Sequence, residues 1–317
     1  MRVFLCLSTC TRRVQALLTA GLLVYPFVVL SATYTVSPTG NDGAAGTAAA
    51  PWRTIQHAAN TARAGDTVTI LAGTYAERVT FSASGTEGKP ITFVGTRGAN
   101  GSWETIVDGS TPVTTWSPAP EIGAGVFKTQ LGYSPGAMTA KNMGIWRIND
   151  RMMRENRGAG TGPDFLKRGP TEPAQIQTGT VQWWDGVEAL FGWIDGTTYL
   201  RFRNQQHPST MQVRAAPGGP VLSINGQSFI TVRHLKVQGG QWAVQVKGGA
   251  AHTTIDQCYL THGEYRLLNE SSTQTTLSNS TLTYDGIGMQ QHPPGDWNTV
   301  KEGGQAWVVN RHQYNLN

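Results

Sequence analysis

The stretch Ile230-Thr-Val-Arg-His-Leu-Lys-Val237 recurs as Thr253-Thr-Ile-Asp-Gln-Cys-Tyr-Leu260 and again as Thr275-Thr-Leu-Ser-Asn-Ser-Thr-Leu282. The three copies begin 23 and then 22 residues apart. A period in the low twenties, with two or three short strands in each repeat, is typical of a parallel β-solenoid in which each repeat forms one coil. The pattern therefore predicts stacked coils with a continuous core.

The register of the copies predicts which residues stack on successive coils. We expect three inward columns: Val232, Ile255 and Leu277; Leu235, Cys258 and Ser280; and Val237, Leu260 and Leu282. We also expect Ile230, Thr253 and Thr275 to stack in one column on successive coils. Cys258 then fills a core position as a small apolar residue, which we favour over a reactive thiol. Arg233 and Asp256 fall side by side on adjacent coils, and we expect a salt bridge rather than a catalytic pair.

Another short strand precedes each copy. Our alignment matches Ile224, Val246 and Leu268, and it puts Lys247 in one column with Asn225 and Asn269. We expect coils of this kind throughout residues 221–317.

The sequence pattern of the N-terminal part, residues 33–112, predicts one helix and several strands. Ile55, Ala58, Ala59 and Ala62 have the spacing of a helix with one buried face. Short apolar and alternating stretches predict strands at 67–71, 78–81, 91–94 and 105–107.

Five motifs in this part carry a resemblance to a known group of proteins. They are Tyr34-Thr-Val-Ser-Pro-Thr-Gly-Asn-Asp-Gly43, Pro51-Trp-Arg-Thr-Ile-Gln56, Ala64-Gly-Asp-Thr-Val68, Gly73-Thr-Tyr75 and Gly88-Lys-Pro-Ile-Thr-Phe93. Together they resemble the N-terminal cap of secreted right-handed parallel β-helix proteins of the pectate-lyase-like superfamily. The resemblance implies an all-β, right-handed parallel β-helix with a helical N-terminal cap. It implies function less specifically, because that superfamily includes polysaccharide lyases, glycoside hydrolases, epimerases and surface proteins.

Residues 113–220 do not keep the solenoid period. Short strands between polar loops predict an inserted β-rich module, similar to the insertion of some β-helix glycosidases. Trp183 and Trp184 could form a platform on which a sugar ring stacks. The alternative, which we favour, is that the aromatic residues pack the module against the solenoid.

Residues 1–32 read as a targeting segment. Arg2, Arg12 and Arg13 precede an apolar stretch over 16–30, the order found in a secretory signal peptide. An uncleaved N-terminal anchor is the alternative, and both place the rest of the chain outside the cytoplasm, secreted or in the cell envelope. Only Cys258 remains after cleavage, so we expect no internal disulfide.

Composition narrows the class and the partners. The 317 residues include 38 Gly and 16 Pro, 14% are charged and 39% are hydrophobic, which excludes both a coiled coil and a disordered chain. Without the three N-terminal arginines, 22 basic residues face 20 acidic ones, so we expect no nucleic-acid partner. We expect a monomer with no membrane partner once the signal is removed.

The C-terminal coils end without a recognisable cap, which suggests that the sequence is truncated. A loop over 290–304 leads into the final strand-like segment, Ala306 to Asn310. This loop is a second place where functional residues could lie.

Residues suited to sugar chemistry occur at the turns of the coils. Uronan lyases use Lys, Arg or His as a base, and hydrolases need two carboxyl groups roughly 5 to 9.5 Å apart. Lys247 is a candidate lyase base or a solvated turn residue. His262, Glu264 and Asp285 are candidate acid and base groups because the repeat brings them into similar register, although turn residues need no function.

We expect a groove between the turn that follows the third strand of a coil and the inserted module. No cluster of aspartates with calcium-site spacing is visible, so we predict no metal or cofactor, with calcium left open for a lyase. We therefore expect a polysaccharide lyase or glycoside hydrolase that acts on a complex or acidic polysaccharide. The alternative is a non-catalytic surface or carbohydrate-binding β-solenoid.

Overall fold

The computed structural model describes residues 31–140, 143–147, 174–176, 179–181, 189–261, 265–282, 298–302 and 306–311. The expected signal peptide over 1–32 lies almost wholly outside this part of the chain. Within the described ranges, no helix is long and apolar enough to cross a membrane.

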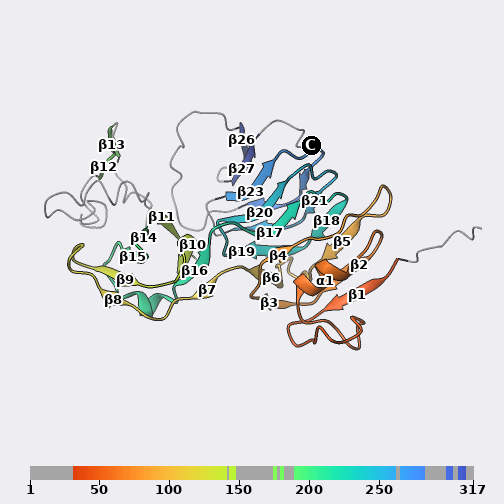
Figure 1. Cartoon of the computed structure of the whole chain (residues 1–317), viewed down its shortest axis with the longest axis horizontal. Helices are drawn as coiled ribbons and strands as arrows, with labels where there is room; N and C mark the ends of the chain where they lie inside the picture. Colours follow the sequence, from red (N-terminus) through yellow and green to blue (C-terminus); the bar gives the residue numbers. More distant parts are fainter. Residues whose placement is uncertain are drawn as a thin grey trace, which may run out of the picture. The chain divides into compact units, whose positions relative to one another are not determined.

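Three parallel sheets form a β-helix in which each coil contributes one strand to each sheet. Sheet 1 contains β4 (Val79–Thr80), β17 (Pro220–Asn225), β20 (Trp242–Lys247), β23 (Tyr265–Glu270) and β27 (Ala306–Arg311), with β26 (Asn298–Glu302) antiparallel to β27. Sheet 2 contains β1 (Thr33–Val36), β2 (Thr67–Ile70), β5 (Ile91–Val94), β18 (Ile230–Arg233), β21 (Thr254–Asp256) and β24 (Thr276–Ser278). Sheet 3 contains β3 (Gly73–Tyr75), β6 (Thr105–Asp108), β19 (Leu235–Gln238), β22 (Tyr259–Leu260) and β25 (Thr281–Leu282). Figure 1 shows β17, β20 and β23 running side by side.

The expected inward columns are confirmed. Val232 pairs with Ile255, and Ile255 pairs with Leu277 on the next coil. The same register places Ile230, Thr253 and Thr275 in one column, while Val237, Leu260 and Leu282 pair in sheet 3. These apolar residues belong to one buried cluster that runs through the solenoid, with Leu277 only partly buried at its edge. Continuous burial of this kind is the main stabilising contribution in a stacked-coil fold.

Single residues with left-handed backbone form the corners between sheets. His234, Gln257 and Asn279 occupy the corner between sheets 2 and 3, with φ values of 60°, 51° and 49°. The corner before sheet 2 contains Phe229 and His252, whose rings stack 4.3 Å apart. At the corner between sheets 2 and 3 one or two residues suffice, so strands only two to four residues long follow each other there without a loop.

One part of the predicted register is wrong. Val246 pairs with Asn269 rather than with Leu268, and Lys247 pairs with Glu270. The turn after β20 is one residue longer than the turns after β17 and β23, because Gly248 and Gly249 both occupy it with positive φ. The alignment already allowed for this residue. Its error lies before β23: it placed Leu268 eight residues after Leu260, whereas Asn269 keeps the nine-residue spacing that separates Val237 from Val246.

The N-terminal cap agrees with its prediction. Helix α1 (Ile55–Thr61) buries Ile55, Ala58 and Ala59 against the first coil. Its N-cap, Thr54, accepts a hydrogen bond from the amide of His57. The carboxylate of Glu77 accepts hydrogen bonds from the amides of Ile55 and Gln56. These acceptors satisfy amides that lack partners in the first turn of a helix.

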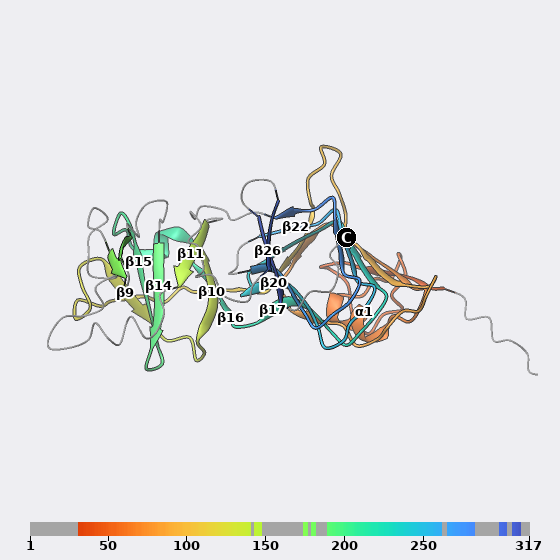
Figure 2. The same ribbon diagram turned by 90° about the horizontal axis from the view of Figure 1, so that it is seen from above.

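The inserted module leaves the solenoid after β6 and returns at β17. Its sheet has the order β7 (Thr111–Pro112), β16 (Arg214–Pro217), β10 (Pro135–Ala140), β11 (Met143–Arg147), β14 (Ala189–Ile194), β15 (Thr197–Phe202), β9 (Val126–Thr129) and β8 (Ser117–Pro118). A separate hairpin joins β12 (Ala174–Ile176) and β13 (Gly179–Val181). Figure 2 shows β9, β14 and β15 alongside one another, as their pairing requires. The module has its own core, which includes Trp116, Met138, Phe191 and Phe202.

The module takes the place of one turn between sheet 3 and sheet 1. In the next coil the same connection is only three residues long, from Gly239 to Gln241. The insertion therefore leaves the register of the coils intact: β17 still pairs with β4 before it and with β20 after it.

Candidate functional site

Most residues of the site expected from the sequence are not described by the structure. His262, Glu264, Asp285, Trp183 and Trp184 all lie outside the described residues. Their proposed roles stay predictions.

Lys247 is described, at the C-terminal end of β20 in sheet 1. It pairs with Asn225, as expected, and with Glu270 on the other side. The turn from sheet 3 enters this strand at Trp242, about 16 Å away at the usual rise of a strand. Lys247 therefore lies at the end of sheet 1 opposite to that turn.

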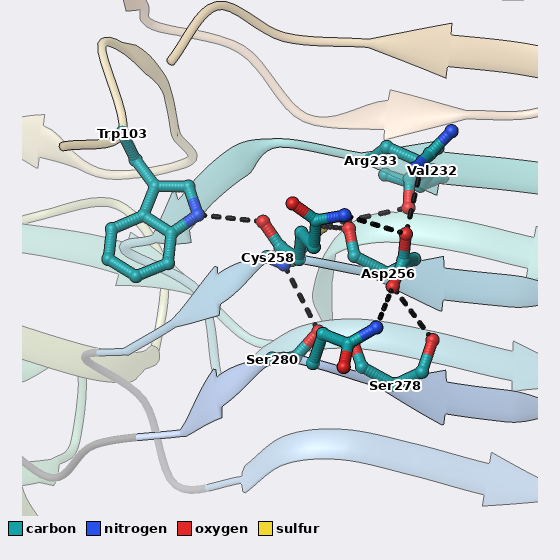
Figure 3. Close-up of polar contacts among 9 residues, drawn as sticks. Trp103, Val232, Arg233, Asp256, Cys258, Ser278 and Ser280 are labelled. Atoms are coloured by element: carbon teal, nitrogen blue, oxygen red, sulfur yellow. Dashed lines mark hydrogen bonds and ion pairs between the residues drawn. The ribbon is translucent and has the colours of Figure 1, made fainter. Parts of the chain in front are cut away.

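A polar network surrounds Asp256 at the corner between sheets 2 and 3 (Figure 3). Arg233 Nε lies 3.1 Å from Asp256 Oδ2, which confirms the expected inter-coil salt bridge. The other oxygen, Oδ1, accepts hydrogen bonds of 2.9 Å from Ser278 Oγ and from Asn279 Nδ2. The network thus joins three successive coils through one carboxylate.

This network makes a pH-dependent contribution to stability. Burial alone would raise the pKa of Asp256, but the hydrogen bonds from Asn279 and Ser278 and the charge of Arg233 outweigh it and lower the pKa below its ordinary 3.8. Because the pKa of Asp256 is lower in the folded protein than in the unfolded chain, its stabilisation is complete at any pH above the unfolded-state pKa. The stabilisation is lost as the pH falls through the folded-state pKa. Asp256→Asn should therefore lower stability at neutral pH and lose less stability than the wild type below about pH 4. Urea unfolding from pH 7 to pH 2 measures this, and identical pH profiles would contradict it.

Cys258 has the structural role expected from the sequence. Its side chain is fully buried, and Sγ lies 3.4 Å from Asp256 O, while its amide donates to Ser280 Oγ at 3.1 Å. Burial raises the pKa of the thiol from 9.0 to about 12. Since the thiolate is the reactive form, the thiol should be inert in the folded protein.

A labelling experiment tests this directly. At pH 8 a thiol reagent should leave Cys258 unmodified in the native protein and modify it fully in urea. Peptide mass spectrometry resolves Cys258 from the other two cysteines. Rapid labelling in the native state would show that the core opens at this position.

A cleft lies at the border between solenoid and module, and we call it the module cleft. Its volume is about 490 Å³, within the usual range for a small-molecule site. Residues from β7, β10, β16, β19 and the 3₁₀ helix Pro208–Met211, with the segments beside them, line it: Pro112, Val113, Thr114, Thr139, Pro208, Ser209, Gln212, Val213, Arg214 and Gln238. The cleft lies beside the end of a third strand of a coil, where the sequence led us to expect a groove.

A buried carboxylate underlies one wall of the module cleft. Asp108, only 4% exposed, accepts hydrogen bonds through Oδ1 from the amide and the hydroxyl of Ser110. Arg214 Nε lies 3.3 Å from Asp108 Oδ2 and 2.8 Å from Ser110 Oγ, and Arg214 Nη2 donates to Ser110 O at 2.7 Å. Because Arg214 belongs to the module and Asp108 to sheet 3, the pair ties the two together.

Gln238 extends this cluster from the neighbouring coil. It pairs with Asp108 in sheet 3, and its Nε2 donates to Asp108 Oδ2 at 3.0 Å. The other amide atom, Oε1, is buried and has no hydrogen-bond partner among the residues that the structure describes. A buried acceptor in this position needs a donor from water or a ligand.

Sequence reasoning missed Asp108, Arg214 and Gln238. Asp108 and Gln238 are 130 residues apart, and Arg214 is 104 residues from Ser110. The repeat predicted the register between Gln238 and the later coils. It could not predict the register with Asp108, because the module separates the two residues in the sequence. The sequence offered one clue, Gly239. Any larger residue at this position would bring a Cβ atom into collision with Asp108 Oδ1.

The described residues hold no group of three or more His, Cys, Asp or Glu side chains that could bind a metal ion. The module cleft has one acid beneath it, Asp108, which Arg214 neutralises. The described part of the site therefore offers hydrogen bonding and apolar walls for binding.

These features define the class of fold: a right-handed parallel β-helix. Residues 38–115 match the model of a family described as a protein of unknown function (DUF1565). A stretch of 58 residues is 53% identical to the uncharacterized protein YwoF of Bacillus subtilis (strain 168), covering 18% of this chain and 12% of YwoF.

The structure of XylC supports this fold, and a second solved structure aligns less well. The structure of XylC in complex with xylose aligns with a TM-score of 0.53 at 15% identity, over 80% of this chain and 54% of XylC. A glycoside hydrolase aligns with a TM-score of 0.47 at 14% identity, over 78% of this chain and 63% of that protein. This chain thus spans about half the length of XylC.

Proposed function

We propose that the protein is an extracytoplasmic carbohydrate-active protein that holds part of a polysaccharide in the module cleft and cleaves it as a lyase or a glycoside hydrolase. The module cleft is the observation that carries this proposal. Its lining combines hydroxyl and amide groups with proline and valine side chains, the mixture that suits a sugar with polar edges and apolar ring faces. The fold shared with XylC, whose structure was solved with xylose, supports the same class.

The candidate acid and base groups belong to the neighbouring coil in the sequence. His262 and Glu264 come one and three residues after Thr261, whose amide donates to Val237 O at 3.0 Å, one residue before Gln238. Hydrolysis needs a pair of carboxyl groups, and Glu264 and Asp285 are our candidates for that pair.

A panel of polysaccharides tests the proposal. The full-length protein is incubated with neutral and acidic polysaccharides, and unsaturated products, new reducing ends and binding are measured in parallel. We expect turnover on at least one member, lost in His262→Ala, Glu264→Ala or Asp285→Ala with an unchanged melting temperature. Binding without turnover would favour the non-catalytic alternative, and absence of binding to every member would refute the proposal.

Lys247 gives a separate reading of the same experiment. A lyase that uses Lys247 as its base would have to hold its substrate along sheet 1, at the end opposite to the turn near the module. Loss of lyase products in Lys247→Ala, with binding retained, would therefore move the reacting bond from the module cleft to sheet 1.

A further inference from the structure

The module joins the solenoid through two short connections that lie side by side. Gly109 and Ser110 link β6 to β7, and Gly218 and Gly219 link β16 back to β17. Because β7 pairs with β16, the chain enters and leaves the module at neighbouring positions. Short connections built from small residues are where domain hinges are often found. We call these two connections together the joint.

Arg78, which directly precedes β4, holds the returning connection. Its Nε donates to Pro220 O at 2.9 Å, while Nη1 donates to Pro217 O at 3.1 Å and Nη2 to Gly218 O at 3.0 Å. Pro217 ends the module strand β16, and Pro220 begins the solenoid strand β17. The N–H groups of a guanidinium point in fixed directions in one plane, so the three carbonyl groups must keep constant relative positions to accept all three hydrogen bonds.

The same side chain packs against the outgoing connection. A Cβ atom at Gly109 would lie 3.0 Å from Arg78 Cγ and 3.0 Å from Val221 Cγ2, so a larger residue would displace a neighbour. The amide of Gly109 donates to Gln238 O at 3.0 Å on the next coil. Gly109 therefore permits a close approach to Arg78, and its hydrogen bond to the solenoid restricts the bending that glycine otherwise allows.

The three hydrogen bonds of Arg78 are charge-assisted. Its side chain is partly buried, and within the described ranges it forms no ion pair with a carboxylate. The backbone carbonyls are thus the acceptors that replace its lost hydration. Hydrogen bonds with a charged donor are roughly twice as strong as those between neutral groups, so these contacts oppose bending of the joint.

We propose that Arg78 is a positioning residue that fixes the joint and keeps the module from rotating relative to the solenoid. The module cleft has walls on both sides of the joint, with Gln238 from the solenoid and Thr139 and Ser209 from the module. A fixed joint holds these walls in place before a ligand binds, which reduces the conformational freedom lost on binding. The inference concerns the joint alone and does not depend on the proposed function.

Hydrogen exchange of the full-length protein, followed by mass spectrometry, tests the role of Arg78. Arg78→Met keeps the length of the side chain and removes all three donors, and Arg78→Lys keeps the charge without the planar guanidinium. We expect the amides of Gly109 and Gly219 to exchange at least tenfold faster in both variants, while those of β18 and β21 keep their rates. Unchanged exchange at the joint would overturn the inference. Equal acceleration in every coil would also contradict it, because Arg78 would then stabilise the fold as a whole.

Arg63→Met is the matched control. Arg63 Nη1 also donates to three backbone carbonyls, but these belong to consecutive residues at the C-terminal end of α1, Asn60, Thr61 and Ala62. This variant should leave exchange at the joint unchanged. If Arg78→Met fails to fold, Arg78→Lys decides the question, because it retains one donor group and the packing of the aliphatic part.

Pulsed electron paramagnetic resonance measures the rotation itself. Nitroxide labels are attached at Thr74→Cys in β3 and Ser117→Cys in β8, both exposed positions, in a full-length chain whose two N-terminal cysteines are replaced by serine. We expect a broader distribution of distances between the labels in Arg78→Met and an unchanged one in Arg63→Met. Equally narrow distributions in both would show that the module stays in place without Arg78, and the inference would be wrong.

Discussion

Ile255→Ala should lower the free energy of unfolding by about 2 to 5 kcal/mol. Ile255 is fully buried and stacks between Val232 and Leu277 on adjacent coils. The column continues through Phe93 into the first coils. Truncation would leave a cavity. The neighbouring coils cannot move in to fill it, because hydrogen bonds between the backbones of successive coils hold them in place.

Thr254→Ala is the matched control for this prediction. Thr254 is the adjacent residue of β21, and its partly exposed side chain points to the opposite face of the sheet. Its replacement should change stability by less than about 0.5 kcal/mol. Urea unfolding followed by far-ultraviolet circular dichroism measures both variants. Equal effects of the two substitutions would mean that the inward columns do not carry the stability of the solenoid.

These columns could be predicted because their information is local and repeated. Val232, Ile255 and Leu277 recur at nearly constant spacing, and any solenoid must stack such positions. The register failed in the strand that contains Leu268, because the connection from Leu260 to that strand is one residue longer than the alignment allowed. Leu267, Leu268 and Asn269 follow one another there, and the pattern alone favoured the apolar residue over the buried asparagine for the inward column.

The module cleft could not be predicted in the same way. Its wall joins Asp108 in sheet 3 to Arg214 at the far end of a non-repeating module. No period relates the two residues, so only the folded chain reveals their contact. The sequence did indicate the general location, because the module interrupts the coils directly after a third strand.

The Asp108 cluster is where we expect the second large effect. Asp108→Ala should destabilise the protein by about 3 kcal/mol, because removing one partner of a buried ion pair leaves the other uncompensated. The side chain of Asp108 is 5% exposed and that of Arg214 is 30% exposed. Because Arg214 is partly in contact with solvent, we expect a loss at the lower end of the range for buried pairs. Ser110 and the donor end of Gln238 would also lose their acceptor.

Glu121→Ala provides the control for Asp108→Ala. Glu121 pairs with Lys128 at 2.6 Å in the same module, but the two side chains are 49% and 39% exposed. An exposed pair of this kind is screened by solvent and contributes little to stability. Both variants remove one acidic partner of an ion pair, so burial is the main difference between them.

Urea unfolding of these two variants measures how far the buried pair holds the module to the solenoid. Asp108→Ala should lose about 3 kcal/mol of unfolding free energy. Glu121→Ala should lose much less, because its ion pair is exposed to solvent. If Asp108→Ala costs no more than Glu121→Ala, the buried pair does not hold the module to the solenoid.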